Sequence, residues 1–287
     1  MKLKSEDEIE AHRYVHCMNR LRSQNRAKPR FSEVETTLAI AHFNAEIIGA
    51  KRNVVWLASQ RHRARMYDEL NGCFTGSFGE DAPDFEEITL PENPPQWIVD
   101  LVDSHSVAKV SEAIWNKITM GKRANGQLAR EITVALPIEL SCEQNIALMQ
   151  EFVQKHIVVL GVVADWVFHN WDENPHARLL HTLRPVVSDG FGPKSIPVLG
   201  ECGRPLRYQE GRKIVYQTVI GGRECLLALR KAWGNVVNRH LECAGLDTRI
   251  DVRSYEEQGI DKVPGKHVGR AKLAMSQRRR DRLPENI

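Results

Sequence analysis

The stretch from Gly161 to Arg184, GVVADWVFHNWDENPHARLLHTLR, constrains the fold more than any other part of the chain. Two apolar runs rich in strand-forming residues, VVADWVF and ARLLHTL, flank a polar cluster that ends in Asn-Pro. This pattern predicts two antiparallel strands joined by a tight connection. Pro175 is compatible with the start of the second strand, because proline is tolerated there. We therefore expect a sheet built around this hairpin.

Two histidines occupy the end of the predicted hairpin. His169 ends the first strand and His176 begins the second, so strand pairing brings the two imidazoles together. Residues two positions apart on a strand share a face, which places Arg178 beside His176 and turns His181 to the opposite face.

The segment resembles the metal-binding hairpin of TraA-type relaxases of the MobA/MobL family. His169, the run Asn174-Pro175-His176 and the run from Thr182 to Pro185 stand where that family has H, N-P-H and T-L-R-P, whereas Arg178 takes the place of the third metal histidine. The segments AIAHF from Ala39, EAIWN from Glu112 and ITVALPIELS also match the family in order. The resemblance implies an α/β fold that is HUH-relaxase-like, with a central, mainly antiparallel sheet of about five strands flanked by helices.

Asn53 is a suitable N-cap for a helix over VVWLASQRHRARMYDEL. The resemblance places the family's catalytic tyrosine at Gln60. Arg61, His62 and Arg65 have helical spacing, so they form either a basic face that contacts phosphates or a solvated surface. Tyr67 would lie two turns, or ~10 Å, beyond Gln60 on this helix, too far to replace the tyrosine.

Relaxases of this class use a tyrosine to attack a DNA phosphodiester while a divalent ion held by three histidines polarises the phosphate. Gln60 cannot provide that nucleophile, because an amide is a poor one, and Arg178 has no lone pair for a metal. Two arrangements remain open. In the first, His169 and His176 hold Mg²⁺ or Mn²⁺ weakly. In the second, Arg178 replaces the ion and binds a phosphate itself. Asp172 is placed to assist either arrangement.

Composition limits the class of protein and suggests its divisions. With 42% hydrophobic and 27% charged residues the chain has an ordinary globular composition. No apolar run approaches ~18 residues, so we expect no membrane segment and a cytoplasmic protein. Six cysteines without a CxxC pair indicate neither a zinc ribbon nor a disulfide framework. We expect a charged N-terminal arm at 1–37, a relaxase-like domain at 38–261 and a basic C-terminal tail at 262–287.

Two hypotheses of function follow from different classes of protein. The first is a conjugal-transfer relaxase homologue that binds single-stranded DNA at a plasmid transfer origin, together with other relaxosome proteins, and has lost nicking and strand transfer. The alternative is a non-enzymatic remnant or accessory protein that acts by protein contact. A nuclease that activates water would need a base that the sequence does not reveal.

Overall fold

The fold is seen in a computed structural model that describes residues 41–76, 82–121, 125–171, 174–200, 202–208, 213–220, 222–254, 256–259 and 261. Five strands form the central sheet, in the order β1 (Phe43–Gly49), β5 (Gln127–Ala135), β7 (Asn174–Thr182), β6 (Ala164–Trp171) and β4 (Phe85–Thr89). Every neighbouring pair is antiparallel. The α/β class and the antiparallel sheet expected from the sequence are confirmed.

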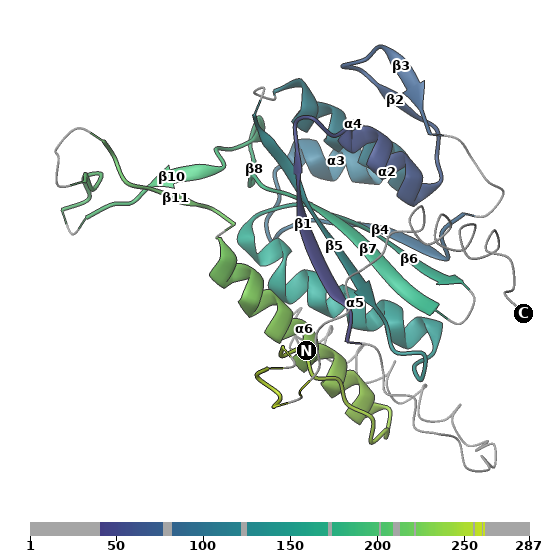
Figure 1. The fold of residues 1–287 in the computed structure, drawn as a ribbon. Coiled ribbons are helices and arrows are strands. Elements are labelled where there is room, and N and C mark those ends of the chain that lie inside the picture. The colour runs from purple at the N-terminus through teal and green to yellow at the C-terminus, as the bar shows by residue number, and fades with distance from the viewer. Residues whose placement is uncertain are drawn as a thin grey trace, which may run out of the picture. The chain divides into compact units, whose positions relative to one another are not determined.

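Helices lie on both faces of the sheet (Figure 1). They are α2 (Val54–His62), α3 (Gln96–Ser104), α4 (Val107–Met120), α5 (Cys142–His156) with the 3-10 turn η1 (Val158–Leu160), and α6 (Arg223–Cys243). Short strands form three further pairs: β2 (Met66–Asp68) with β3 (Cys73–Thr75), β8 (Val186–Val187) with β9 (Gly190–Phe191), and β10 (Ser195–Pro197) with β11 (Tyr216–Thr218).

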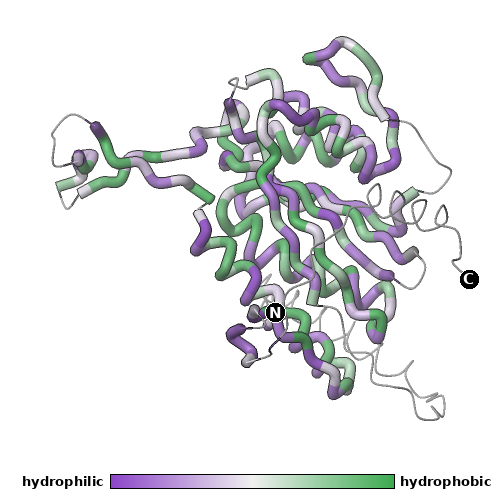
Figure 2. The backbone as a smooth tube through the Cα atoms, in the orientation of Figure 1, coloured by the Kyte–Doolittle hydropathy of each residue, from purple (hydrophilic) through white to green (hydrophobic). Residues whose placement is uncertain are grey.

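Two hydrophobic cores result, because successive strand residues point to opposite faces. On one face Trp166 and Leu179 pack with Phe152 of α5 and Trp233 of α6. On the other face, Leu180 belongs to the core formed with residues of α2, α3 and α4. Hydrophilic residues interrupt the strands of the sheet (Figure 2), and several of them build the sites described below.

Local capping fixes the ends of several helices. The Asn53 side chain accepts a hydrogen bond from the Trp56 N–H at 2.9 Å and so caps α2, as the sequence predicts. Ser141 and Gln144 form a capping box at the start of α5. Gly245 follows α6 with a φ of 75°, the left-handed conformation that favours glycine.

The predicted helix over VVWLASQRHRARMYDEL is wrong beyond His62. Arg63 takes the left-handed conformation with a φ of 49°, which ends α2, and the chain continues into the β2–β3 hairpin. Buried Asp68 holds this hairpin to the start of α2 by accepting a hydrogen bond from the Asn53 amide at 2.7 Å. Tyr67 lies on β2, where its ring packs against Phe74, so its expected place along a continuous helix is also wrong.

The expected arm at 1–37 and tail at 262–287 lie outside the described residues, and those boundaries stay predictions. Within the described part of the chain, none of the helices has the length and apolar character needed to cross a membrane.

Candidate functional site

The two hairpin histidines meet as the sequence predicts. His169 on β6 and His176 on β7 are directly paired in the strand register, and their ring centroids are 5.4 Å apart. Nδ1 of His176 lies 2.9 Å from the Asn174 carbonyl oxygen. Because a carbonyl only accepts, this contact assigns a proton to Nδ1 of His176.

Arg178 lies two residues further along β7, on the same face as His176. Its guanidinium donates to Glu131 Oε1 on β5 at 3.1 Å, and the Arg61 guanidinium from α2 approaches the same oxygen at 2.5 Å. Glu131 is buried and Arg61 is only 1% exposed, whereas the Arg178 side chain is 37% exposed. Burial raises the pKa of Glu131, but the two arginines outweigh it and hold that pKa below its usual value.

The surroundings of His169 are also positively charged. Burial, followed by the charges of His176, Arg63 and Arg178, lowers the pKa of His169 to about 4. His169 is therefore neutral near pH 7, and the positive groups around it include the guanidiniums of Arg63 and Arg178. Arg63 reaches this place because α2 ends one residue before it.

His62 corrects an expectation. We expected it on a phosphate-contacting face, but it is 3% exposed and both ring nitrogens face carboxylates. Nδ1 is 2.7 Å from Glu86 and Nε2 is 2.6 Å from Asp165. Burial alone lowers the pKa of His62, but the charge of Asp165 and the hydrogen bonds to Asp165 and Glu86 raise it to about 9. His62 is therefore a buried imidazolium engaged with carboxylates, not a residue presented to phosphates.

Asp165 completes this buried cluster. It also accepts hydrogen bonds from the Ser111 hydroxyl and the Trp115 indole, both at 2.6 Å. Every donor around Asp165 comes from α2 or α4, so the cluster joins these helices to β6.

Gln60 and Arg65, two further residues of the expected site, lie in different parts of the structure. Gln60 lies half-buried in the last turn of α2, one position before Arg61. Arg65 instead lies beyond the helix, where its guanidinium covers the Phe74 ring at 4.3 Å from the centroid. The structure thus brings Arg61 and Arg178 together on the sheet face that carries the histidine pair. Arg65 instead packs against the β2–β3 hairpin. Asp172 lies outside the described residues.

The residues present do not fit a three-ligand metal site. A divalent ion of the kind this fold family uses needs donors with lone pairs, and Arg178 has none at the third position. Its guanidinium is also bound to Glu131, the nearby carboxylate. Across the residues that the structure describes, no group of three or more His, Cys, Asp or Glu side chains is placed to hold a metal.

Sequence reasoning missed Glu131, Asp165, Arg63 and Glu86. The first two carried a recognisable sign, since each is an acidic residue within a strongly apolar strand, in LAREITVAL and VVADWVF. A charge inside such a strand is seldom left unpaired. Glu86 and Arg63 carried no comparable sign, because their roles depend on how β4 and the end of α2 meet the sheet.

Known conjugal transfer and mobilization proteins are similar to this chain in sequence. A model of the MobA/MobL family matches residues 52–278. The conjugal transfer protein TraA of Rhizobium radiobacter is 45% identical over 235 residues, covering 81% of this chain and 21% of the relative. That of Agrobacterium fabrum is 43% identical over 244 residues, covering 84% and 22%.

A solved structure, "Molecular Basis of Vancomycin Resistance Transfer in Staphylococcus aureus", superposes with a TM-score of 0.58 and 28% identity, covering 75% of this chain and 98% of that one. The chain belongs to the MobA/MobL family of conjugal-transfer and mobilisation relaxases. It spans about a fifth of the length of the TraA relatives, 21% of the Rhizobium radiobacter protein.

Proposed function

We propose that this chain binds single-stranded DNA at a plasmid transfer origin, in the cytoplasm and with other relaxosome proteins, but does not carry out nicking and strand transfer. The observation that carries the proposal is the position of Arg178, at the third metal-ligand place of the family and beside His176.

The local charge balance supports phosphate binding. Two guanidiniums, those of Arg61 and Arg178, share the carboxylate of Glu131, so this part of the sheet face keeps an excess positive charge. Arg178 is partly exposed and can redirect its donors toward a phosphate while Arg61 continues to neutralise Glu131. Arginine contacts to phosphate position a strand without reading its sequence, and they give strongly salt-dependent binding.

The residues at the nucleophile position support the loss of strand transfer. Gln60 has only a carboxamide, which cannot form a phosphodiester link to DNA. Tyr67 lies on β2 and not on the helix that carries Gln60. With an incomplete ligand set for a divalent ion as well, both parts of the family's chemistry are impaired.

A binding titration tests the first half of the proposal. The full chain is titrated with fluorescent single-stranded oligonucleotides from transfer origins between ~50 and ~200 mM salt. We expect affinity to fall steeply and linearly with the logarithm of the salt concentration. If no oligonucleotide binds even at the lowest salt concentration, the result favours the alternative hypothesis of a non-enzymatic remnant or accessory protein.

A covalent-adduct assay tests the second half. The protein is incubated with labelled oligonucleotides that span candidate origins, with Mg²⁺ or Mn²⁺, and then run on denaturing gels. We expect no protein-linked band. A band that survives denaturation would show that a residue at another position acts as the nucleophile. The same assay on Tyr67→Phe would show whether that residue is Tyr67.

A further inference from the structure

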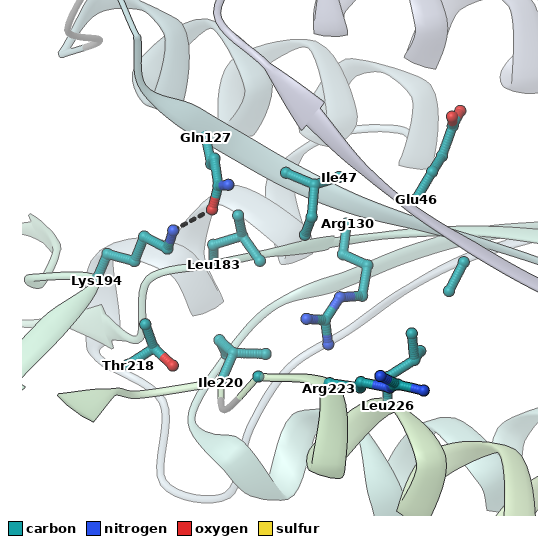
Figure 3. A pocket seen from close by; sticks show the side chains of 12 residues that line it. Glu46, Ile47, Gln127, Arg130, Leu183, Lys194, Thr218, Ile220, Arg223 and Leu226 are labelled. Carbon is teal, nitrogen blue, oxygen red and sulfur yellow. Dashed lines mark hydrogen bonds between the residues drawn. The ribbon is translucent and has the colours of Figure 1, made fainter.

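A second site lies on the opposite face of the sheet from the histidine pair. It is a pocket of about 310 Å³ between β1, β5 and the start of α6. The register of β5 explains the separation, because Glu131 faces the paired histidines and its neighbour Arg130 points to the other face. The pocket walls are partly apolar and include Ile47, Leu183, Ile220 and Leu226 (Figure 3).

Arg130 is the unusual residue of this pocket. It is 7% exposed, and Figure 3 shows its guanidinium extending toward Ile220 and the start of α6. No acceptor among the described residues hydrogen-bonds or ion-pairs with it, and its Nη1 is fully buried without a partner there. Buried arginine is normally paired, because an isolated buried charge loses its hydration without compensation.

Other positive groups gather at the same pocket. Lys194 and Arg223 line it, and burial together with the charges of Arg130 and Arg184 lowers the pKa of Lys194. The 21-residue helix α6 begins here at Gly222, without a side chain capping its first turn. Its N–H groups therefore add positive potential. Glu46 also lines the pocket, but its carboxylate points away from Arg130 (Figure 3) and is held by Arg52 at 2.7 Å.

We propose that this pocket binds a phosphate group carried on a small, partly apolar body, as in a nucleotide. The phosphate would sit between the guanidinium of Arg130 and the N-terminus of α6, and the apolar walls would contact the sugar and base. A free nucleotide and the terminal phosphate of a DNA strand share this chemistry. The proposal does not depend on the proposed function, because it concerns other residues on the other face.

The binding test uses the full chain and isothermal titration calorimetry. The probes are inorganic phosphate, thymidine monophosphate, thymidine, and a short oligonucleotide with or without a 5′-phosphate. We expect the monophosphate to bind with a dissociation constant of ~1 mM or tighter, and thymidine not to bind. A gain in oligonucleotide affinity from the 5′-phosphate that is lost in Arg130→Met would assign the site to a DNA end, and monophosphate binding without such a gain would assign it to a free nucleotide.

Substitutions locate the site. Arg130→Met and, separately, Arg223→Gln are expected to weaken monophosphate binding by at least ~tenfold and by a few-fold, respectively. Arg239→Gln removes a charge near the other end of α6 and should leave monophosphate binding unchanged. Arg223 is exposed, so its variant keeps the test valid if Arg130→Met does not fold. Absence of binding of both inorganic phosphate and thymidine monophosphate at ~10 mM, or monophosphate binding unchanged in both pocket variants, would overturn the proposal.

Discussion

Asp165 and Glu131 are buried carboxylates that lie on either side of Leu180 in one row of the sheet, yet their surroundings differ. Asp165 accepts from His62, Ser111 and Trp115, all of them buried. Glu131 forms an ion pair with buried Arg61 and accepts a hydrogen bond from Arg178, which is partly exposed.

The difference separates a structural cluster from a candidate binding site. We call the group formed by Asp165 with His62, Ser111 and Trp115 the closed cluster, and the group formed by Glu131 with Arg61 and Arg178 the open cluster. The donors around Asp165 have no exposed member, so this cluster can stabilise the packing of α2 and α4 on the sheet but cannot meet a DNA strand. Around Glu131, Arg178 can exchange its carboxylate partner for a phosphate without leaving a buried charge unpaired, because Arg61 stays in place.

The largest expected effect distinguishes the two clusters by stability. Asp165→Asn leaves the imidazolium of His62 without its main buried partner and should lower the free energy of unfolding by about 3–5 kcal/mol. Arg178→Gln leaves Glu131 paired with Arg61 and should cost less than about 1 kcal/mol. Urea unfolding at pH 7 measures both. Equal losses in the two variants would remove the distinction between a closed and an open cluster.

The next-largest expected effect is a gain of nicking activity when the missing tyrosine and the third histidine are introduced at the site beside the open cluster. Gln60→Tyr combined with Arg178→His supplies a nucleophile and a third imidazole beside two histidines already 5.4 Å apart. We expect nicking of an origin from an intact relaxase to rise at least ~10³-fold over the wild type in the double variant, with neither single change sufficient. Calorimetry with Mn²⁺ should show tighter binding in Arg178→His than in the wild type. A double variant that folds and binds DNA but never cleaves would show that the site has other faults.

The third effect is a pH dependence that comes from the closed cluster. The pKa of His62, which faces Asp165 and Glu86, is about 9 in the folded state against 6.5 ordinarily. A raised pKa contributes stability that is complete below pH 6.5 and is lost as the pH rises toward 9, here roughly 3 kcal/mol. Urea unfolding across this range should show the decline, and His62→Gln should flatten it. An unchanged slope in that variant would assign the decline to another group.

Local patterns in the sequence were enough for much of the fold. The hairpin alternation predicted the pairing of His169 with His176, and the capping residue Asn53 predicted where α2 begins. These signals act within a few residues, so no distant contact is needed to interpret them.

The site was less predictable because it depends on long-range contacts. His62 has the helical spacing of a basic face, but Asp165, which captures it, is 103 positions away in sequence. The chain after α2 likewise folds into the β2–β3 hairpin, which buried Asp68 fixes by accepting hydrogen bonds from Asn53 and Asn71, 15 and 3 positions away. Glu131 lies on β5, and its two arginine partners come from two other elements, α2 and β7.

The smallest expected effect measures whether Arg178 meets DNA. If its guanidinium contacts one phosphate, Arg178→Gln should reduce the magnitude of the slope of log affinity against log salt by about 0.7, the value for one phosphate of a single strand. Binding should weaken about equally for an origin sequence and a scrambled one, because a phosphate contact carries no sequence information. Arg239→Gln is the matched control, since Arg239 is similarly exposed and also paired with a glutamate, Glu151. An equal change of slope in both variants would mean that net charge, and not a contact at the histidine pair, accounts for the effect. A change confined to Arg178→Gln would place the DNA backbone at the open cluster.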